Sequence, residues 1–138
     1  MIGVDTNILL RAVMTDDAEQ SPQAELFLSA RTRDDPAMIN SVVLAEFVWT
    51  LRKHFGLPRA EIVGILRDLV SSEAFEFADR GAVLEAFHSY ENGIGSFTDR
   101  LIAEINDRND RNGCRATATF DSGAMKCPPF ISVFEARR

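Results

Sequence analysis

The stretch Met1–Leu10, MIGVDTNILL, decides the fold. Its first four residues are mostly apolar and predict a short buried strand, and the apolar residues after Asn7 recur at helical spacing. Between them, the polar triplet Asp5-Thr6-Asn7 places a carboxylate where the strand ends and the helix begins. In an open α/β sheet, ligands bind outside the carboxyl ends of the strands. We therefore expect Asp5 to lie at a ligand-binding edge.

Length and composition are those of a soluble globular protein. The 138 residues suit one domain, and 46% of them are hydrophobic and 26% charged. No apolar run approaches the roughly 18 residues that a membrane span requires. No basic segment precedes the first apolar stretch, so we expect no cleaved signal peptide. Cys114 and Cys127 fit neither a disulfide framework nor a zinc pattern, so we expect reduced thiols and a cytoplasmic protein without membrane partners.

The net charge of −6 limits how the chain could bind a polyanion. Binding of nucleic acid by bulk electrostatics depends on many Lys and Arg contacts with phosphate. A chain of this charge would instead meet a polyanion through a local basic patch or a bound metal ion.

Strand and helix patterns alternate along the chain. Ser21 before Pro22 predicts the start of a helix that ends at Asp34-Asp35-Pro36, and Ser41 predicts the cap of the next helix. Alternating elements imply a parallel sheet that helices cover on both faces. We predict one three-layer α/β/α domain over residues 1–138, with strand order 3-2-1-4-5. The expected strands lie at residues 1–4, 37–39, 75–77, 116–120 and 130–133.

Four acidic residues occupy equivalent positions in this predicted fold. Asp5 ends the first strand and Asp121 ends the fourth. Glu46 lies in the second turn of the helix after the second strand, and Asp99 lies in the first turn of the helix before the fourth. In the order 3-2-1-4-5, strands one and four lie on either side of the topological switch point. The four carboxylates are therefore expected to converge.

Each acid alone has an ordinary structural explanation. Asp99 completes the pattern Ser96-x-x-Asp99, a variant of the capping box, and the helix dipole favours an acid in a first turn. Glu46 lies beside an apolar stripe and could be a solvated helix residue. Asp5 and Asp121 could be turn or N-cap residues. The common placement of all four at one predicted edge favours a functional site over four unrelated structural roles.

Converging carboxylates favour a divalent cation. Two carboxylates 4–5 Å apart repel by about 3–4 kcal/mol at an effective dielectric near 20. Oxygen ligands without His or Cys favour hard ions such as Mg²⁺ or Mn²⁺, which also engage phosphates. A metal-bound water that attacks a phosphodiester bond is the chemistry that such a site suits.

The motifs around these acids resemble those of the PIN-domain ribonucleases, and within them the VapC-type toxins of prokaryotic toxin–antitoxin pairs. The resemblance covers the chain from its first residues to its last strand. It rests on VDTNILL at residues 4–10, SVVLAE at residues 41–46, TDRLIA at residues 98–103 and TFD at residues 119–121.

The resemblance implies an endoribonuclease that depends on Mg²⁺ or Mn²⁺ and is held inactive by a cognate antitoxin. It assigns the acids to Asp5, Glu46, Asp99 and Asp121, with Asn7 and Thr119 orienting them. It also implies a homodimer, and the apolar residues Trp49, Phe55 and Leu57 could supply the surface that binds either the second copy or the antitoxin. Arg100 is the candidate for contact with a substrate phosphate.

Other classes of protein fit less well. A receiver domain needs an early acidic pair and a lysine after its last strand, whereas Pro128-Pro129 stands at that place. A phosphatase of the haloacid dehalogenase type needs Asp-x-Asp, and the chain has Asp5-Thr6-Asn7. A PIN nuclease outside toxin–antitoxin systems and a non-catalytic binding module with the same fold stay open as alternatives.

Overall fold

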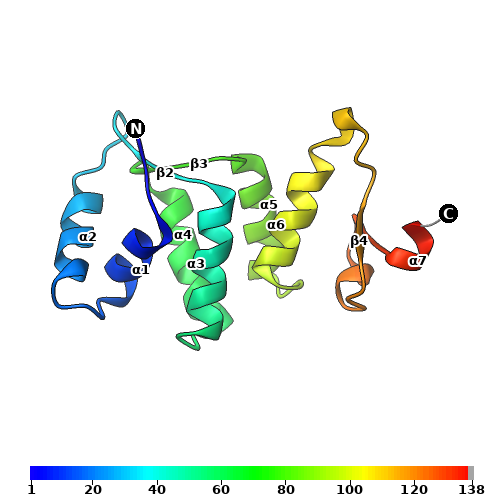
Figure 1. The fold of residues 1–138 in the computed structure, drawn as a ribbon, viewed down its shortest axis with the longest axis horizontal. Helices are drawn as coiled ribbons and strands as arrows, with labels where there is room; N and C mark the ends of the chain where they lie inside the picture. Colours follow the sequence, from blue (N-terminus) through cyan, green and yellow to red (C-terminus); the bar gives the residue numbers. More distant parts are fainter. Residues whose placement is uncertain (137–138) are drawn as a thin grey trace. The chain divides into compact units, whose positions relative to one another are not determined.

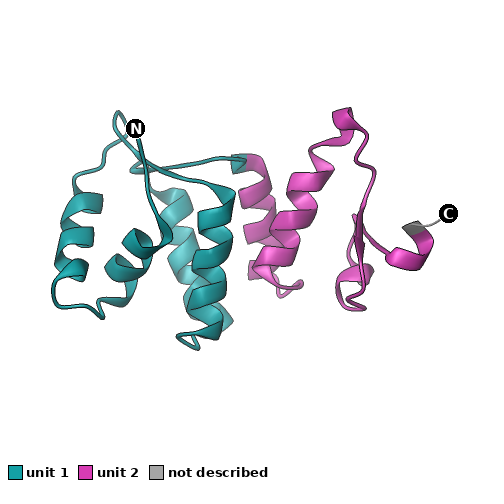
Figure 2. Ribbon diagram, in the orientation of Figure 1, with its two compact units in different colours: residues 1–80 teal, residues 81–138 magenta. Residues whose placement is uncertain are grey.

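The computed structural model describes residues 1–136 and divides them into two compact units, residues 1–80 and residues 81 onward (Figures 1 and 2). Seven α-helices, five short strands and two 3₁₀ turns lie within the described residues. In chain order they are β1 (Ile2–Gly3), α1 (Thr6–Met14), α2 (Gln20–Ser29), β2 (Ala37–Ile39), α3 (Ser41–Lys53), α4 (Arg59–Ser71), β3 (Phe75–Phe77), α5 (Arg80–Glu91), α6 (Phe97–Asp107), η1 (Asp110–Asn112), β4 (Thr117–Thr119), η2 (Ala124–Lys126), β5 (Phe130–Ser132) and α7 (Val133–Ala136).

The first unit contains a parallel three-stranded sheet with the order β1-β2-β3. Ile2 pairs with Ala37, and Ala37 pairs with Phe75. Helices α1, α2, α3 and α4 belong to the same unit, and α1 packs against both α2 and α3. The alternation of strands and helices predicted this parallel arrangement.

The second unit has its own two-stranded parallel sheet, in which Thr117 of β4 pairs with Phe130 of β5. The expected single sheet with the order 3-2-1-4-5 is therefore wrong: the order 3-2-1 and the pair 4-5 are formed, but in separate sheets. The described residues contain no pairing of β1 with β4. The physical reason is the length of β1, because a strand of two residues offers few backbone groups for a second partner. Both of its residues are exposed, so the expected buried first strand is also wrong.

Apolar residues at helical spacing form the core of the first unit. Leu44, Phe47 and Leu51 of α3 are fully buried, as are Ile62 and Leu66 of α4. In the second unit, the Tyr90 and Phe97 rings lie edge to face with their centroids 6.0 Å apart. Within the described part of the chain, no helix is long and apolar enough to cross a membrane.

Two helix starts differ from their predictions. Helix α2 begins at Gln20, so Ser21 is a buried residue of its first turn and not its N-cap. The Asp17 carboxylate accepts the N–H groups of Glu19 and Gln20, and the Ser21 hydroxyl accepts the N–H of Asp17. Helix α3 is capped by Asn40, whose side chain accepts the N–H of Val43, and not by Ser41.

The other boundaries differ at two places. Helix α2 ends at Ser29, several residues before the predicted stop at Asp34, because residues 32–35 close a turn of their own through hydrogen bonds between Thr32 and Asp35. Val133, which was expected to end the last strand, begins the short helix α7.

Asp17 gives the start of α2 a pH dependence that can be measured. The pKa of its carboxyl group lies below the ordinary value because the N–H groups of Gln20 and Glu19 donate to it. A carboxyl group whose pKa is lowered in the folded state stabilises the fold at pH values above its unfolded-state pKa of about 3.9. This stabilisation is lost as the pH falls through the folded-state pKa. We expect Asp17→Asn, which keeps an acceptor oxygen, to make the urea midpoint less dependent on pH below about 4. An unchanged pH profile would contradict this.

Candidate active site

Asp5 lies at the N-terminus of α1. Its backbone is extended, and its Oδ1 accepts the N–H of Thr6 at 2.7 Å. The neighbours Val4 and Thr6 are buried, so the exposed carboxylate is held at a fixed point of the first unit. The N-cap role, which the sequence left open as an alternative, is therefore formed by one carboxylate oxygen. The other oxygen has no hydrogen-bond partner among the described residues.

Glu46 and Asn7 belong to the same unit as Asp5. Glu46 lies in the second turn of α3 beside the buried Phe47, and its own side chain is exposed. Because α1 packs against α3, Asp5 and Glu46 are carried by neighbouring helices (Figure 1). Asn7 is exposed in the first turn of α1 and borders a groove of about 390 Å³. The groove is also lined by Ile8, Arg11, Gln20, Gln23, Ala24 and Phe27.

Asp99 lies in the first turn of α6, in the second unit. The Ser96 hydroxyl caps the helix by accepting the N–H of Asp99 at 3.1 Å. This is one half of the capping box that the sequence suggested as an alternative. The reciprocal bond from the backbone of Ser96 to the Asp99 carboxylate is not formed within the described residues. The Asp99 side chain is half-buried.

Asp121 lies in the turn after β4. Its Oδ1 accepts the N–H groups of Gly123 at 2.8 Å and of Ala124 at 3.2 Å. The Thr119 hydroxyl accepts the N–H of Asp121 at 3.0 Å. These bonds fix the direction of the carboxylate and leave its second oxygen without a partner in the described part of the chain. Thr119 thus contacts the backbone of Asp121, and the role of orienting the acids that the resemblance implies for it stays a prediction.

Asp99 and Asp121 line the same pocket, although they are 22 positions apart in the sequence. The pocket has a volume of about 190 Å³ and lies within the second unit. Its other lining residues are Gly95, Ser96, Arg100, Gly123, Ala124, Cys127 and Phe130. The structure therefore brings together two of the four predicted acids. Because Asp5 and Glu46 belong to the first unit, the convergence of all four stays a prediction.

The two carboxylates of this pocket fit a hard divalent cation. Each has at least one oxygen that no described residue engages, and carboxylate oxygens are the ligands that Mg²⁺ and Mn²⁺ prefer. Within residues 1–136, no group of three or more His, Cys, Asp and Glu side chains forms a metal site. Mg²⁺ keeps several waters and is commonly bound through one or two carboxylates, so a pair of acids is compatible with it.

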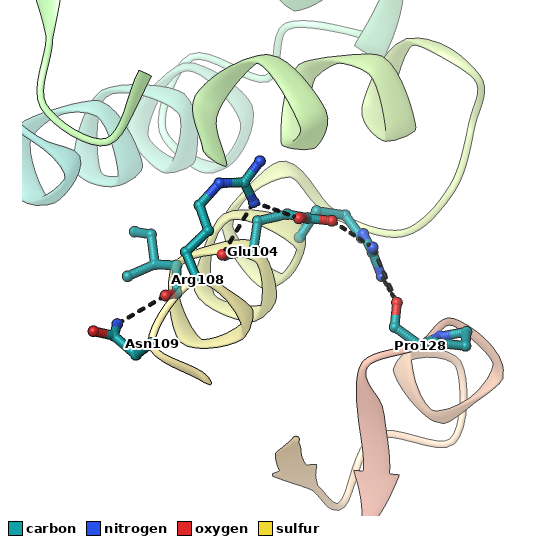
Figure 3. Close-up of polar contacts among 6 residues, drawn as sticks. Glu104, Arg108, Asn109 and Pro128 are labelled. Carbon is teal, nitrogen blue, oxygen red and sulfur yellow. Dashed lines mark hydrogen bonds and ion pairs between the residues drawn. The ribbon is translucent and has the colours of Figure 1, made fainter. Parts of the chain in front are cut away.

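Arg100 is buried and engages other parts of the second unit. Its Nη1 and Nη2 both lie 3.2 Å from the carbonyl oxygen of Pro128, and Nη2 lies 3.2 Å from Oε1 of Glu104. Oε2 of Glu104 forms a second ion pair with Nη1 of Arg108, at a distance of 2.8 Å (Figure 3). The i,i+4 spacing of Glu104 from Arg100 and from Arg108 is a sequence pattern typical of such ion pairs. No sequence pattern indicates the contact with Pro128. The phosphate contact expected of Arg100 stays a prediction.

Comparison with known protein families assigns the chain to one of them. The PIN domain family matches residues 2–122, a span that covers residues of both compact units, so the chain belongs to the PIN domain family. This confirms the resemblance at the level of the family. Members of this family are typically nucleases that depend on divalent metal ions. A comparison with curated proteins found no match.

Gly123 makes the orientation of Asp121 testable. A Cβ atom at Gly123 would lie 3.2 Å from Oδ1 of Asp121, while the φ of Gly123 is −68°, which any residue adopts. Gly123→Ala is therefore expected to shift the carboxylate by a few tenths of an ångström without straining the backbone. We expect the rate of RNA cleavage to fall by roughly 3- to 10-fold, because a displaced catalytic group lowers the rate of the reaction. Gly64→Ala, which meets no atom within 4 Å, is the control, and equal activity of the two variants would contradict the prediction.

Proposed function

We propose that this chain is an endoribonuclease, dependent on Mg²⁺ or Mn²⁺, that acts as the toxin of a type II toxin–antitoxin pair. The observation that carries the proposal is the common pocket of Asp99 and Asp121 in a member of the PIN domain family. In this proposal Asp5, Glu46, Asp99 and Asp121 hold the cation, and RNA is the substrate. Asn7 and Thr119 support the acids.

The contacts of the two acids in the pocket support their proposed role as ligands of the cation. Asp121 is held by two backbone N–H groups through one oxygen and presents the other. Asp99 extends from a helix that is already capped by Ser96, so its carboxylate is available. When bound, the cation would supply Lewis acidity toward a phosphoryl oxygen and would activate water for hydrolysis. The protein's contribution is to fix the acids in advance, which lowers the cost of organising them.

The toxin role adds two partners. We propose that a cognate antitoxin protein binds the chain and blocks its site, and that the chain itself forms a homodimer. The resemblance of the four motifs to the VapC-type toxins supports both. Trp49 of α3 is 58% exposed, as an interface residue of the free chain should be. The alternatives are a PIN nuclease of another pathway and a non-catalytic PIN module.

The first test is cleavage of a mixture of structured RNAs by the purified protein, with EDTA, Mg²⁺ or Mn²⁺. Cleavage that requires the metal, and that Asp5→Asn loses, is expected. Growth arrest on expression in cells, absent for Asp5→Asn, separates a toxin from a PIN nuclease of another pathway. A wild-type protein that neither cleaves RNA with any metal nor arrests growth would leave the binding module as the better account.

A further inference from the structure

Arg100 connects α6 with the segment that follows Asp121. Its side chain is 8% exposed, and both terminal nitrogens of its guanidinium donate to the carbonyl of Pro128, which is 28 residues away in the sequence. Pro128 directly precedes Pro129, whose carbonyl accepts the N–H of Thr117 in β4. One charged side chain thus holds together two elements that each carry an acid of the pocket.

Hydrogen bonds join several residues of the segment from Asp121 to Cys127. The Asp121 carbonyl accepts the N–H of Met125, and the Ala124 carbonyl accepts the N–H of Cys127. The Asp121 carboxylate is bound in turn to the N–H groups of Gly123 and Ala124. Pro128 follows Cys127 directly, so these hydrogen bonds connect the residue that precedes Pro128 with the Asp121 carboxylate.

The ion pair between Arg100 and Glu104 helps to keep the guanidinium in this position. Glu104, whose side chain is 14% exposed, pairs with Arg100 on α6. It also pairs with Arg108, the C-cap residue of that helix (Figure 3). The Nε atom of Arg100 is buried and has no hydrogen-bond partner among the described residues. A buried donor without a hydrogen-bond partner lowers the stability of the fold. Stabilisation of the fold therefore does not by itself explain why this guanidinium is buried.

From these contacts we propose that Arg100 is a positioning residue, which holds the segment 121–128 against α6 so that Asp121 keeps its place beside Asp99. The inference rests on the proposed nuclease function for its effect on catalysis. We call the contact between Arg100 and the Pro128 carbonyl the tether. The tether can be tested without an activity assay, because Cys127 lines the same pocket and neighbours Pro128.

The test measures how fast a thiol reagent labels Cys127 in a Cys114→Ser background, for which circular dichroism establishes that each variant is folded. Arg100→Gln removes the charge and the paired contacts with Pro128. We expect it to raise the labelling rate by about ten-fold through local opening of the segment. Arg100→Lys keeps the charge but cannot reproduce the two-pronged contact, so an intermediate rate is expected.

Arg108→Gln is the matched control, since it also removes an ion pair with Glu104 but does not touch Pro128. Its labelling rate should equal that of the parent. Equal rates for Arg100→Gln and Arg108→Gln would overturn the tether. Should the Gln variant fail to fold, the comparison of Arg100→Lys with Arg108→Gln decides in the same way.

Cleavage kinetics then separate positioning from mere stabilisation. Arg100→Lys is expected to lower kcat by about 10-fold or more, with KM for RNA changed less than about 2-fold, because a displaced acid impairs the reaction more than substrate binding. A rise in KM with constant kcat would instead identify Arg100 as a contact of the substrate and overturn the proposal. Absence of cleavage by the wild type, with the labelling difference intact, would refute the nuclease and leave the tether standing.

Discussion

Asp99→Asn is expected to abolish RNA cleavage that depends on a divalent cation, with kcat/KM reduced by about 1,000-fold or more. The substitution keeps the size of the side chain and the backbone N–H that Ser96 accepts, so α6 keeps its cap. It removes a negative charge from a pocket that also contains Asp121. The measurement is cleavage of a labelled RNA over a range of Mg²⁺ and Mn²⁺ concentrations.

Two comparisons make this result specific. Asp107→Asn changes an exposed acid at the last residue of the same helix and should leave cleavage unchanged. The free energy of unfolding of Asp99→Asn without metal should equal that of the wild type or be slightly higher, because one of two like charges in a pocket has been removed. An Asp99→Asn variant with wild-type activity would refute the role of this residue, whatever the family.

The sequence predicted best those features that depend on near neighbours along the chain. The apolar stripe of α3 and the cap of α6 by Ser96 follow from residues three or four positions apart, and both are formed. It also predicted that Asp99 and Asp121 lie close together, and both line one pocket, whereas their membership of one site with Asp5 and Glu46 stays a prediction. The prediction assumed the sheet order 3-2-1-4-5, which is not formed, so the proximity of Asp99 and Asp121 does not depend on that order.

The features it missed depend on contacts that no local pattern encodes. Pairing of β1 with β4 would join segments more than one hundred residues apart, and a two-residue strand carries almost no signal about its second neighbour. The position of Ser21 before Pro22 predicted Ser21 as the cap of α2. The residue that accepts the N–H groups at the helix start is instead Asp17, which lies several residues earlier. The contact between Arg100 and Pro128 could not be predicted because the acceptor is a backbone carbonyl, which any residue type supplies.

Phe47→Ala is expected to reduce the free energy of unfolding by about 3–5 kcal/mol, the usual cost of truncating a buried phenylalanine. Phe47 is fully buried in α3, so the substitution leaves a cavity next to Leu44 and Leu51. A small domain has about 5–15 kcal/mol of total stability, so this one change removes a large part of it. Urea unfolding followed by circular dichroism measures the loss.

Val42→Ala is the control for Phe47→Ala, because it truncates an apolar residue of the same helix that is 77% exposed. Its effect on the unfolding of the monomer should be within about 0.5 kcal/mol, as for other surface substitutions. Similar losses for the two variants would contradict the assignment of the buried stripe. Because Glu46 is adjacent to Phe47 on α3, activity of Phe47→Ala should fall in proportion to its unfolded fraction, whereas loss of an acid removes activity from a protein that is still folded.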